Sequence, residues 1–142
     1  MLHKSADQNI TTMKKYILFV CNENSARSQM AEGFFNYYNK NPEYVGISAG
    51  LKMTDAVKPY AIDVMKEKNI DISTQKPKLL TLDMVENAYK IYTMGCIKSC
   101  PAAPPEKTFD WKLEDPSGKP IETYRQIRDD IEQRIKKLVS EL

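Results

Sequence analysis

Histidine and long apolar runs are the first things that the sequence lacks. Its single histidine, His3, stands near the N-terminus, so we expect a nucleophile in the rest of the chain to be activated without an imidazole. No apolar run approaches the length needed to cross a bilayer. The first 12 residues have no apolar centre like that of a signal peptide. We therefore expect a cytoplasmic protein with no membrane partner.

Cysteine and clustered positive charge are also scarce. The chain has three cysteines, an odd number that fits chemistry or burial better than a framework of structural disulfides. In the cytoplasm we expect these thiols to be reduced at rest. The net charge is +2 and no dense basic stripe is present, which argues against a nucleic-acid partner.

The length of 142 residues suits one ordinary domain whose core needs no disulfide. Residues 1–14 are interpreted as a polar tail, with Met13 as an alternative start, and residues 15–142 as the domain. We find no internal repeat or low-complexity stretch, and we expect a monomer.

Strand patterns alternate with helix patterns along the chain. Short apolar runs predict strands over 16–20, 44–48, 90–94 and 108–113, and apolar periodicity predicts helices over 26–40, 59–68, within 81–87 and from 120 onward. This order implies right-handed crossovers and an α/β fold with a parallel sheet covered on both faces.

Three of these patterns make specific statements about side chains. Met30, Phe34, Tyr37 and Tyr38 fall on one stripe of the predicted 26–40 helix. Alternation of Phe109, Trp111 and Leu113 supports the strand over 108–113. In the C-terminal helix, opposite charges four residues apart, such as Asp130 and Arg134, are expected to pair.

The chemistry-bearing residues follow the strands. In an open parallel sheet the ligand site lies beyond the carboxyl ends of the strands. The loops after the first, third and fourth predicted strands carry residues 21–27, then Cys96 and Cys100, then Asp115. The topology therefore gathers all three cysteines and one acid at a single edge.

Cys21 opens the first of these loops. A loop that leaves a strand and begins a helix presents backbone N–H groups to an anion, and the helix dipole adds to the attraction. These groups and Arg27 favour a Cys21 thiolate without histidine, and Ser28 can donate a further hydrogen bond. Arg27 offers a planar fork that matches an oxyanion, and Asn24 tolerates the left-handed backbone that such a loop needs. Cys-x5-Arg alone equally fits a buried cysteine; the strand before it and the helix after it favour catalysis.

Asp115 has two interpretations. A carboxyl group on this edge can protonate a leaving oxygen as a general acid. The Asp-Pro and Ser-Gly pairs around it are equally typical of a turn. Asp110, Glu114 and Asp129 are interpreted as solvated charges.

Cys96 and Cys100 allow three interpretations. Zinc needs four ligands, and only Cys21 and His3 remain to complete a set, so a zinc site is disfavoured. Burial is an alternative, although the loop is polar and bounded by proline. A dithiol beside a nucleophilic thiolate is the interpretation that we favour.

Taken together, "VCNENSARSQMAEGFF", "SAG", "DIS", "TMGC…CP" and "EDPSGK" resemble, in this order, the thioredoxin-coupled arsenate reductases related to low-molecular-weight tyrosine phosphatases. The resemblance covers roughly residues 15–140. It implies a four-stranded parallel sheet in the order 2-1-3-4. It also implies an oxyanion-binding loop made of Asn22, Glu23, Asn24, Ser25, Ala26 and Arg27.

The resemblance further implies a reaction on arsenate. Cys21 would attack the oxyanion held by Arg27 and the loop amides, Ser28 would hold the thiolate, and Asp115 would protonate the leaving group. Cys96 would then attack the Cys21 adduct and release arsenite, and Cys100 would move the disulfide to Cys96–Cys100 for thioredoxin to reduce. No bound cofactor is implied.

Phosphatase relatives stop at a phosphocysteine that water cleaves, and they need no further thiol. They commonly carry an aromatic residue after Asp-Pro, where this chain has Ser117. A non-catalytic anion sensor is a third alternative, but it would need neither Asp115 nor the cysteine pair. The spacer between those two cysteines is three residues, shorter than in some reductases.

Some members of the resembled family bind potassium beside the loop. The matching residues here are Asn24, Glu32 and Ser48, with Lys78 in place of an aspartate ligand. We therefore expect no metal requirement, because the Lys78 ammonium can replace the cation.

Overall fold

The computed structural model describes residues 14–95 and 103–142. The predicted tail up to residue 13 and the predicted roles of Cys96 and Cys100 lie outside the described residues. Within the described ranges, no helix is both long enough and apolar enough to cross a membrane.

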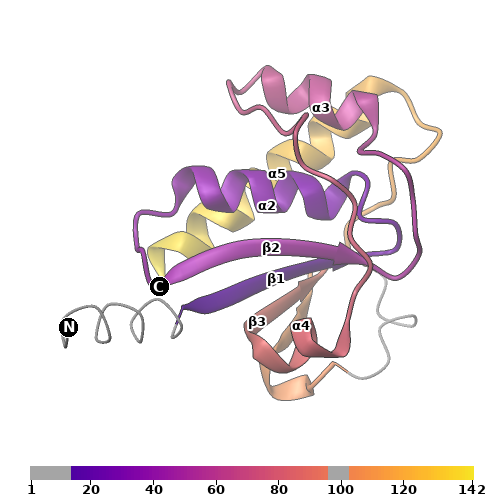
Figure 1. Ribbon diagram of the computed structural model, residues 1–142. Helices are drawn as coiled ribbons and strands as arrows, with labels where there is room; N and C mark the ends of the chain where they lie inside the picture. Colours follow the sequence, from indigo (N-terminus) through magenta and orange to yellow (C-terminus); the bar gives the residue numbers. More distant parts are fainter. Residues whose placement is uncertain (1–13, 96–102) are drawn as a thin grey trace, which may run out of the picture.

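In the described residues, four strands and four α-helices follow one another in the predicted order. In chain order they are β1 (Lys15–Cys21), α2 (Arg27–Tyr38), β2 (Tyr44–Gly50), α3 (Pro59–Lys66), α4 (Leu82–Asn87), β3 (Ala88–Thr93), a 3₁₀ turn (Pro105–Lys107), β4 (Thr108–Asp110) and α5 (Ile121–Ser140). The strands form one parallel sheet in the order β2-β1-β3-β4 (Figure 1). The expected α/β fold and strand order are confirmed.

Helices cover both faces of the sheet because β1 is apolar on both sides. Successive strand side chains point to opposite faces. Ile17, Phe19 and Cys21 join the larger core beneath α2, α3 and α5, whereas Leu18 and Val20 join a smaller core beneath α4 (Figure 1). Adjacent residues at the end of β1 therefore face two different surfaces at the same edge.

The stripe predicted on α2 holds except at Tyr37. Met30, Phe34 and Tyr38 recur every four residues, and the first two are fully buried. Tyr37 lies about 100° around the helix from Tyr38 and is 51% exposed, so its assignment to the stripe was wrong. Gly33, a weak helix former, is explained by packing, because a Cβ there would stand 2.7 Å from Ile72 Cγ2.

The predicted strand over 108–113 is wrong beyond Asp110. Lys112 adopts a positive φ of 53°, which ends the extended backbone. Trp111 instead packs on Phe19 and Tyr92, with ring centroids 6.0 and 5.0 Å apart, and Leu113 is buried. The alternation therefore does not mark a longer strand: Trp111 and Leu113 pack against the core, whereas Phe109 is 45% exposed.

Ion pairs form both within α5 and between α5 and its neighbours. The predicted Asp130–Arg134 pair is confirmed at 2.8 Å on the exposed face. On the inner side Glu132 is buried, accepts a hydrogen bond from the Tyr38 hydroxyl and lies 3.2 Å from Lys68 Nζ. Burial alone would raise the pKa of Glu132, but these two partners outweigh it and hold the pKa below its ordinary value.

We expect Glu132→Gln to lower the free energy of unfolding at pH 7 by about 1–3 kcal/mol, because Lys68 loses a buried charged partner. Because the pKa of Glu132 is lower in the folded chain, its contribution is complete above about pH 4.3 and is lost as the pH falls through the folded value. Urea unfolding of both proteins at several pH values checks this. A stability difference that does not shrink on acidification would contradict it.

Candidate active site

Residues 21–27 connect β1 to α2 and form the floor of a polar cavity of about 210 Å³. The cavity is lined by Cys21, Asn22, Glu23, Ser25, Ala26, Arg27, Lys52, Asp115 and Ser117. Cys21 is a free cysteine, 3% exposed, and its Sγ accepts a hydrogen bond from the Asn24 backbone N–H at 3.2 Å. The structure thus brings Cys21, Arg27 and Asp115 together as predicted.

The end of β2 braces this loop from outside. Leu51 N and Lys52 N donate to Asn22 O at 2.7 and 2.9 Å. The backbones approach closely because Gly50 has no side chain: a Cβ there would lie 2.7 Å from the carbonyl carbon of Glu23. The "SAG" at the end of this strand is therefore part of the site's framework.

Asn24 occupies the left-handed backbone that we expected, with a φ of 55°. Its Oδ1 accepts from Lys78 N at 2.8 Å and from Gln29 Nε2 at 2.9 Å, so its Nδ2 is the group that donates to Ser28 Oγ at 2.7 Å. Ser28 Oγ therefore accepts from Asn24, and its own proton points to Cys21 Sγ, 2.9 Å away. The Cys21 sulfur is therefore the acceptor of both hydrogen bonds, from Ser28 and from the Asn24 amide.

A pair of glutamines behind the loop was missed by the sequence analysis. Gln29 is fully buried, and its Nε2 also donates to Asn24 O at 3.0 Å and Lys76 O at 3.1 Å. Gln75 Nε2 donates to Gln29 Oε1 at 2.7 Å. The sequence could have indicated Gln29 only through its position: it lies four residues before Gly33, on the helix face that packs against 72–76.

Arg27 is buried and anchored to the backbone at two places. Its Nη1 donates to Met94 O at 2.5 Å and to Leu113 O at 3.1 Å, and its Nη2 lies 4.0 Å from Asp115 Oδ2. Gly95 makes room for this arrangement, because a Cβ there would lie 2.7 Å from Leu113 O and its φ is 101°. The guanidinium is therefore held in one orientation beside the cavity.

Asp110 helps to form the same edge, so its interpretation as a solvated charge was wrong. Its Oδ1 accepts from Thr93 Oγ1 at 2.8 Å and from Gly95 N at 2.9 Å. These bonds fix the turn that follows β3. Glu114 and Asp129 are largely exposed; Glu114 forms an ion pair with Lys119, and Asp129 forms one with the buried Arg128.

Asp115 lies both in a turn and at the cavity, so its position fits both interpretations. Its Oδ1 accepts from Ser117 N at 3.0 Å, which makes a turn, and the residue also lines the cavity. Partial burial opposes ionisation, but the Ser117 hydrogen bonds and the charges of Arg27 and Lys58 hold the pKa of Asp115 below its ordinary value. A general acid must first gain a proton, and an oxyanion beside Asp115 would raise its pKa by repulsion.

Lys78, Glu32 and Ser48 form a polar cluster beside Asn24, which we call the Lys78 cluster. Lys78 Nζ stands 3.5 Å from Glu32 Oε1, which also accepts from Ser48 Oγ at 2.7 Å. Lys78 N donates to Asn24 Oδ1, so the same residue contacts both the loop and the carboxylate. Among the described residues, no group of three His, Cys, Asp or Glu side chains could hold a metal ion.

Comparisons with known proteins agree with this arrangement. The model of the family "Low molecular weight phosphotyrosine protein phosphatase" matches residues 16–142. "Arsenate reductase 1" of Staphylococcus haemolyticus (strain JCSC1435) is 38% identical over 130 residues, 86% of this chain and 92% of the relative.

Two solved structures share the fold. The low molecular weight protein tyrosine phosphatase from T. tengcongensis has a TM-score of 0.81 at 29% identity, covering 91% of this chain and all of its own. An arsenate reductase in the phosphate binding state has a TM-score of 0.77 at 33% identity, covering 89% of this chain and 98% of its own. This chain therefore belongs to the low molecular weight phosphotyrosine protein phosphatase family.

Proposed function

We propose that this protein reduces arsenate to arsenite through a Cys21 adduct and a three-cysteine disulfide relay. The observation that carries the proposal is the Cys21 sulfur, held by Ser28 and the Asn24 amide in an anion pocket beside Arg27. The 38% identity to an arsenate reductase supports arsenate as the substrate.

In the proposed first step the Cys21 thiolate attacks arsenic(V) and an As–OH oxygen leaves as water. The pocket amides and the anchored Arg27 balance the negative charge of the oxyanion. Asp115, which lines the cavity, supplies the proton to the leaving oxygen after the bound anion has raised its pKa. The product is a Cys21–S–As(V) adduct.

In the proposed relay a Cys96 thiolate attacks the Cys21 sulfur. The S–As bond breaks, arsenic keeps the electron pair and leaves as arsenite, and a Cys21–Cys96 disulfide forms. Cys100 then attacks Cys96, which frees Cys21 and leaves a Cys96–Cys100 disulfide. An external dithiol such as thioredoxin returns two electrons and two protons, so the cycle uses no bound cofactor.

The second candidate is phosphoester hydrolysis, which the family membership and the structural similarity to a tyrosine phosphatase both favour. The cavity argues for the smaller substrate, because its described lining holds polar side chains and Ala26 but no aromatic ring to stack on an aryl ester. Ser117 stands at the position where the resembled phosphatases commonly carry that ring.

The two candidates are separated by running two assays on one preparation. One assay follows arsenite release with thioredoxin, thioredoxin reductase and NADPH; the other follows hydrolysis of p-nitrophenyl phosphate. Cys96→Ser should stop arsenate turnover and leave any ester hydrolysis unchanged, because only reduction consumes that thiol. Normal arsenate turnover by Cys96→Ser would refute the relay.

The Lys78 cluster gives a prediction about salts. The Lys78 ammonium beside Glu32 supplies the positive charge that a bound cation would otherwise provide, so turnover and Tm should differ little between potassium and sodium chloride at equal ionic strength. Lys78→Asp should introduce a potassium preference, since it adds an oxygen ligand beside Glu32 and Ser48 and keeps the backbone bond to Asn24. A paired salt titration checks both proteins. A strong potassium requirement in the wild type would contradict the assignment.

A further inference from the structure

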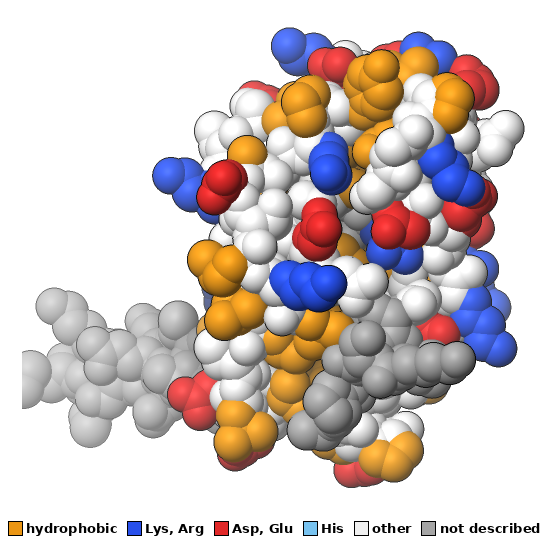
Figure 2. All heavy atoms as spheres, turned by 90° about the vertical axis from the view of Figure 1, so that its right-hand side faces the viewer, with side chains coloured by type: hydrophobic (Ala, Val, Ile, Leu, Met, Phe, Trp, Pro, Cys, Tyr) orange, Lys and Arg blue, Asp and Glu red, His pale blue; other side chains and the backbone are white. Residues whose placement is uncertain are grey.

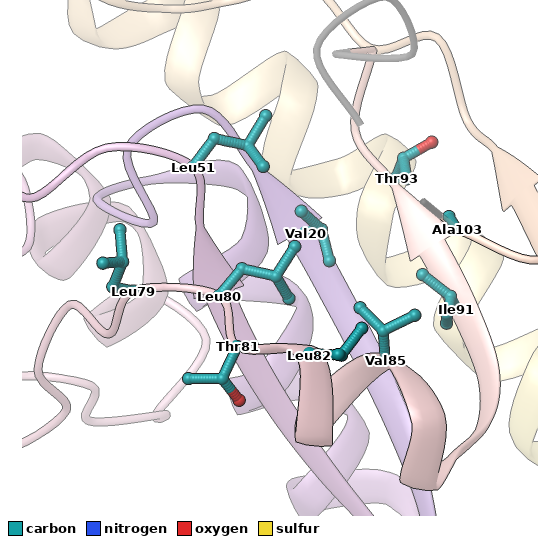
Figure 3. Close-up of a pocket in the computed structure, with 10 residues that line it drawn as sticks. All are labelled: Val20, Leu51, Leu79, Leu80, Thr81, Leu82, Val85, Ile91, Thr93 and Ala103. Atoms are coloured by element: carbon teal, nitrogen blue, oxygen red, sulfur yellow. The ribbon is translucent and has the colours of Figure 1, made fainter. Parts of the chain in front are cut away.

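A second concavity, apolar in contrast to the anion pocket, lies at the same edge of the sheet. Its volume is about 320 Å³, and the ten described residues that line it are eight aliphatic side chains and two threonines (Figure 3). In Figure 2, which faces this edge, hydrophobic side chains gather below the middle and charged ones are mixed above. We call this concavity the leucine groove.

The leucine groove begins one residue before the nucleophile. Val20 lines it from β1, whereas Cys21 lines the anion pocket, because neighbouring strand residues face opposite sides. Leu51 forms another wall, and its N–H donates to the Cys21 and Asn22 carbonyls at 3.2 and 2.7 Å. The groove and the anion pocket are thus two sides of the same short stretch of backbone.

Two leucines of the groove remain exposed to solvent. Leu79 is 45% exposed, and Leu82, the first residue of α4, is 64% exposed. Exposed leucines beside an uncharged hollow form an apolar patch of the kind that marks a protein contact.

The chain itself indicates which partner this patch serves. Thr93 and Ala103 both line the groove, and the chain between them carries both relay cysteines. Cys96 is three residues after Thr93 and Cys100 is three residues before Ala103, so only a short length of chain separates each cysteine from a groove residue. A protein that reaches a Cys96–Cys100 disulfide must therefore place its own surface at or beside the groove.

We propose that the leucine groove docks the protein dithiol that reduces the Cys96–Cys100 disulfide, through an apolar surface next to the partner's reactive cysteine. This inference rests on the proposed relay. The partner's first thiolate attacks the disulfide and forms a mixed disulfide; its second thiolate displaces this chain's sulfur. The partner leaves oxidised, and its two electrons and two protons remain on Cys96 and Cys100.

The groove is tested with Leu82→Glu, using thioredoxin as the probe. An acidic residue in the first turn of α4 is compatible with the helix, so the fold should persist and a CD melt verifies it. We expect kcat/KM for thioredoxin to fall about tenfold, as for loss of one apolar contact residue. Arsenate turnover with dithiothreitol, which needs no docking surface, should be unchanged.

Met53→Glu is the matched control. Met53 is 71% exposed, lies outside the groove lining and receives the same charge change. Equal loss in both variants, or no loss in Leu82→Glu, would overturn the docking inference and leave the proposed function standing. A wild-type dimer that Leu82→Glu dissociates would assign the groove to a second copy and also overturn the inference. Absence of arsenite with both reductants would instead refute the proposed function, and the docking inference with it.

Discussion

Replacing Cys21 by serine should abolish arsenate reduction and any phosphoester hydrolysis, lowering each by more than about 10⁴-fold. In both proposed mechanisms the Cys21 sulfur attacks first, and a serine hydroxyl held by the same hydrogen bonds is a much weaker nucleophile. Serine keeps a small polar group within reach of Ser28 and Asn24, so the loop should retain its shape.

The measurement pairs both assays with thermal unfolding in the presence of inorganic phosphate. Phosphate should still raise the Tm of Cys21→Ser, because Arg27 and the loop that we propose to bind the anion are intact. That protection separates loss of the nucleophile from loss of the pocket. Substantial activity of Cys21→Ser in either assay would remove this thiol from the mechanism.

Arg27→Lys should lower kcat/KM for either reaction by about 10²–10³-fold, although the positive charge is kept. A lysine ammonium cannot donate to Met94 O and Leu113 O and at the same time present a second planar N–H edge to the oxyanion. Phosphate protection in thermal unfolding should fall together with activity. Arg134→Lys is the control, since Arg134 makes an exposed pair with Asp130 and should tolerate the change. Equal activity of Arg27→Lys and wild type would show that charge alone suffices.

Much of the site could be predicted from the sequence because parallel topology gathers loops at one edge. The continuous apolar run of β1 and the helix after it located Cys21, Asn24, Arg27 and Ser28 correctly relative to each other. Asp115 was placed by the same reasoning, since β4 is parallel to the other strands and the chain leaves it at this edge.

The remaining features depend on contacts that span the fold. Gln29 and Gln75 are ordinary polar residues in the sequence, and only packing of α2 against 72–76 brings them together at 2.7 Å. Asp110 looks like a surface charge until the turn after β3 supplies its donors. The pattern of Phe109, Trp111 and Leu113 was ambiguous for the same reason, since core contacts with Phe19 and Tyr92 produce the same alternation as a strand.

A single-turnover experiment with Cys100→Ser and arsenate, without any reductant, tests the central claim most directly. The relay should then stop at its second stage, because no thiol remains to release Cys21. We expect one equivalent of arsenite per protein and a Cys21–Cys96 disulfide in the peptide map. No arsenite and no Cys21–Cys96 disulfide, with p-nitrophenyl phosphate hydrolysis intact, would contradict the reductase and leave a phosphatase.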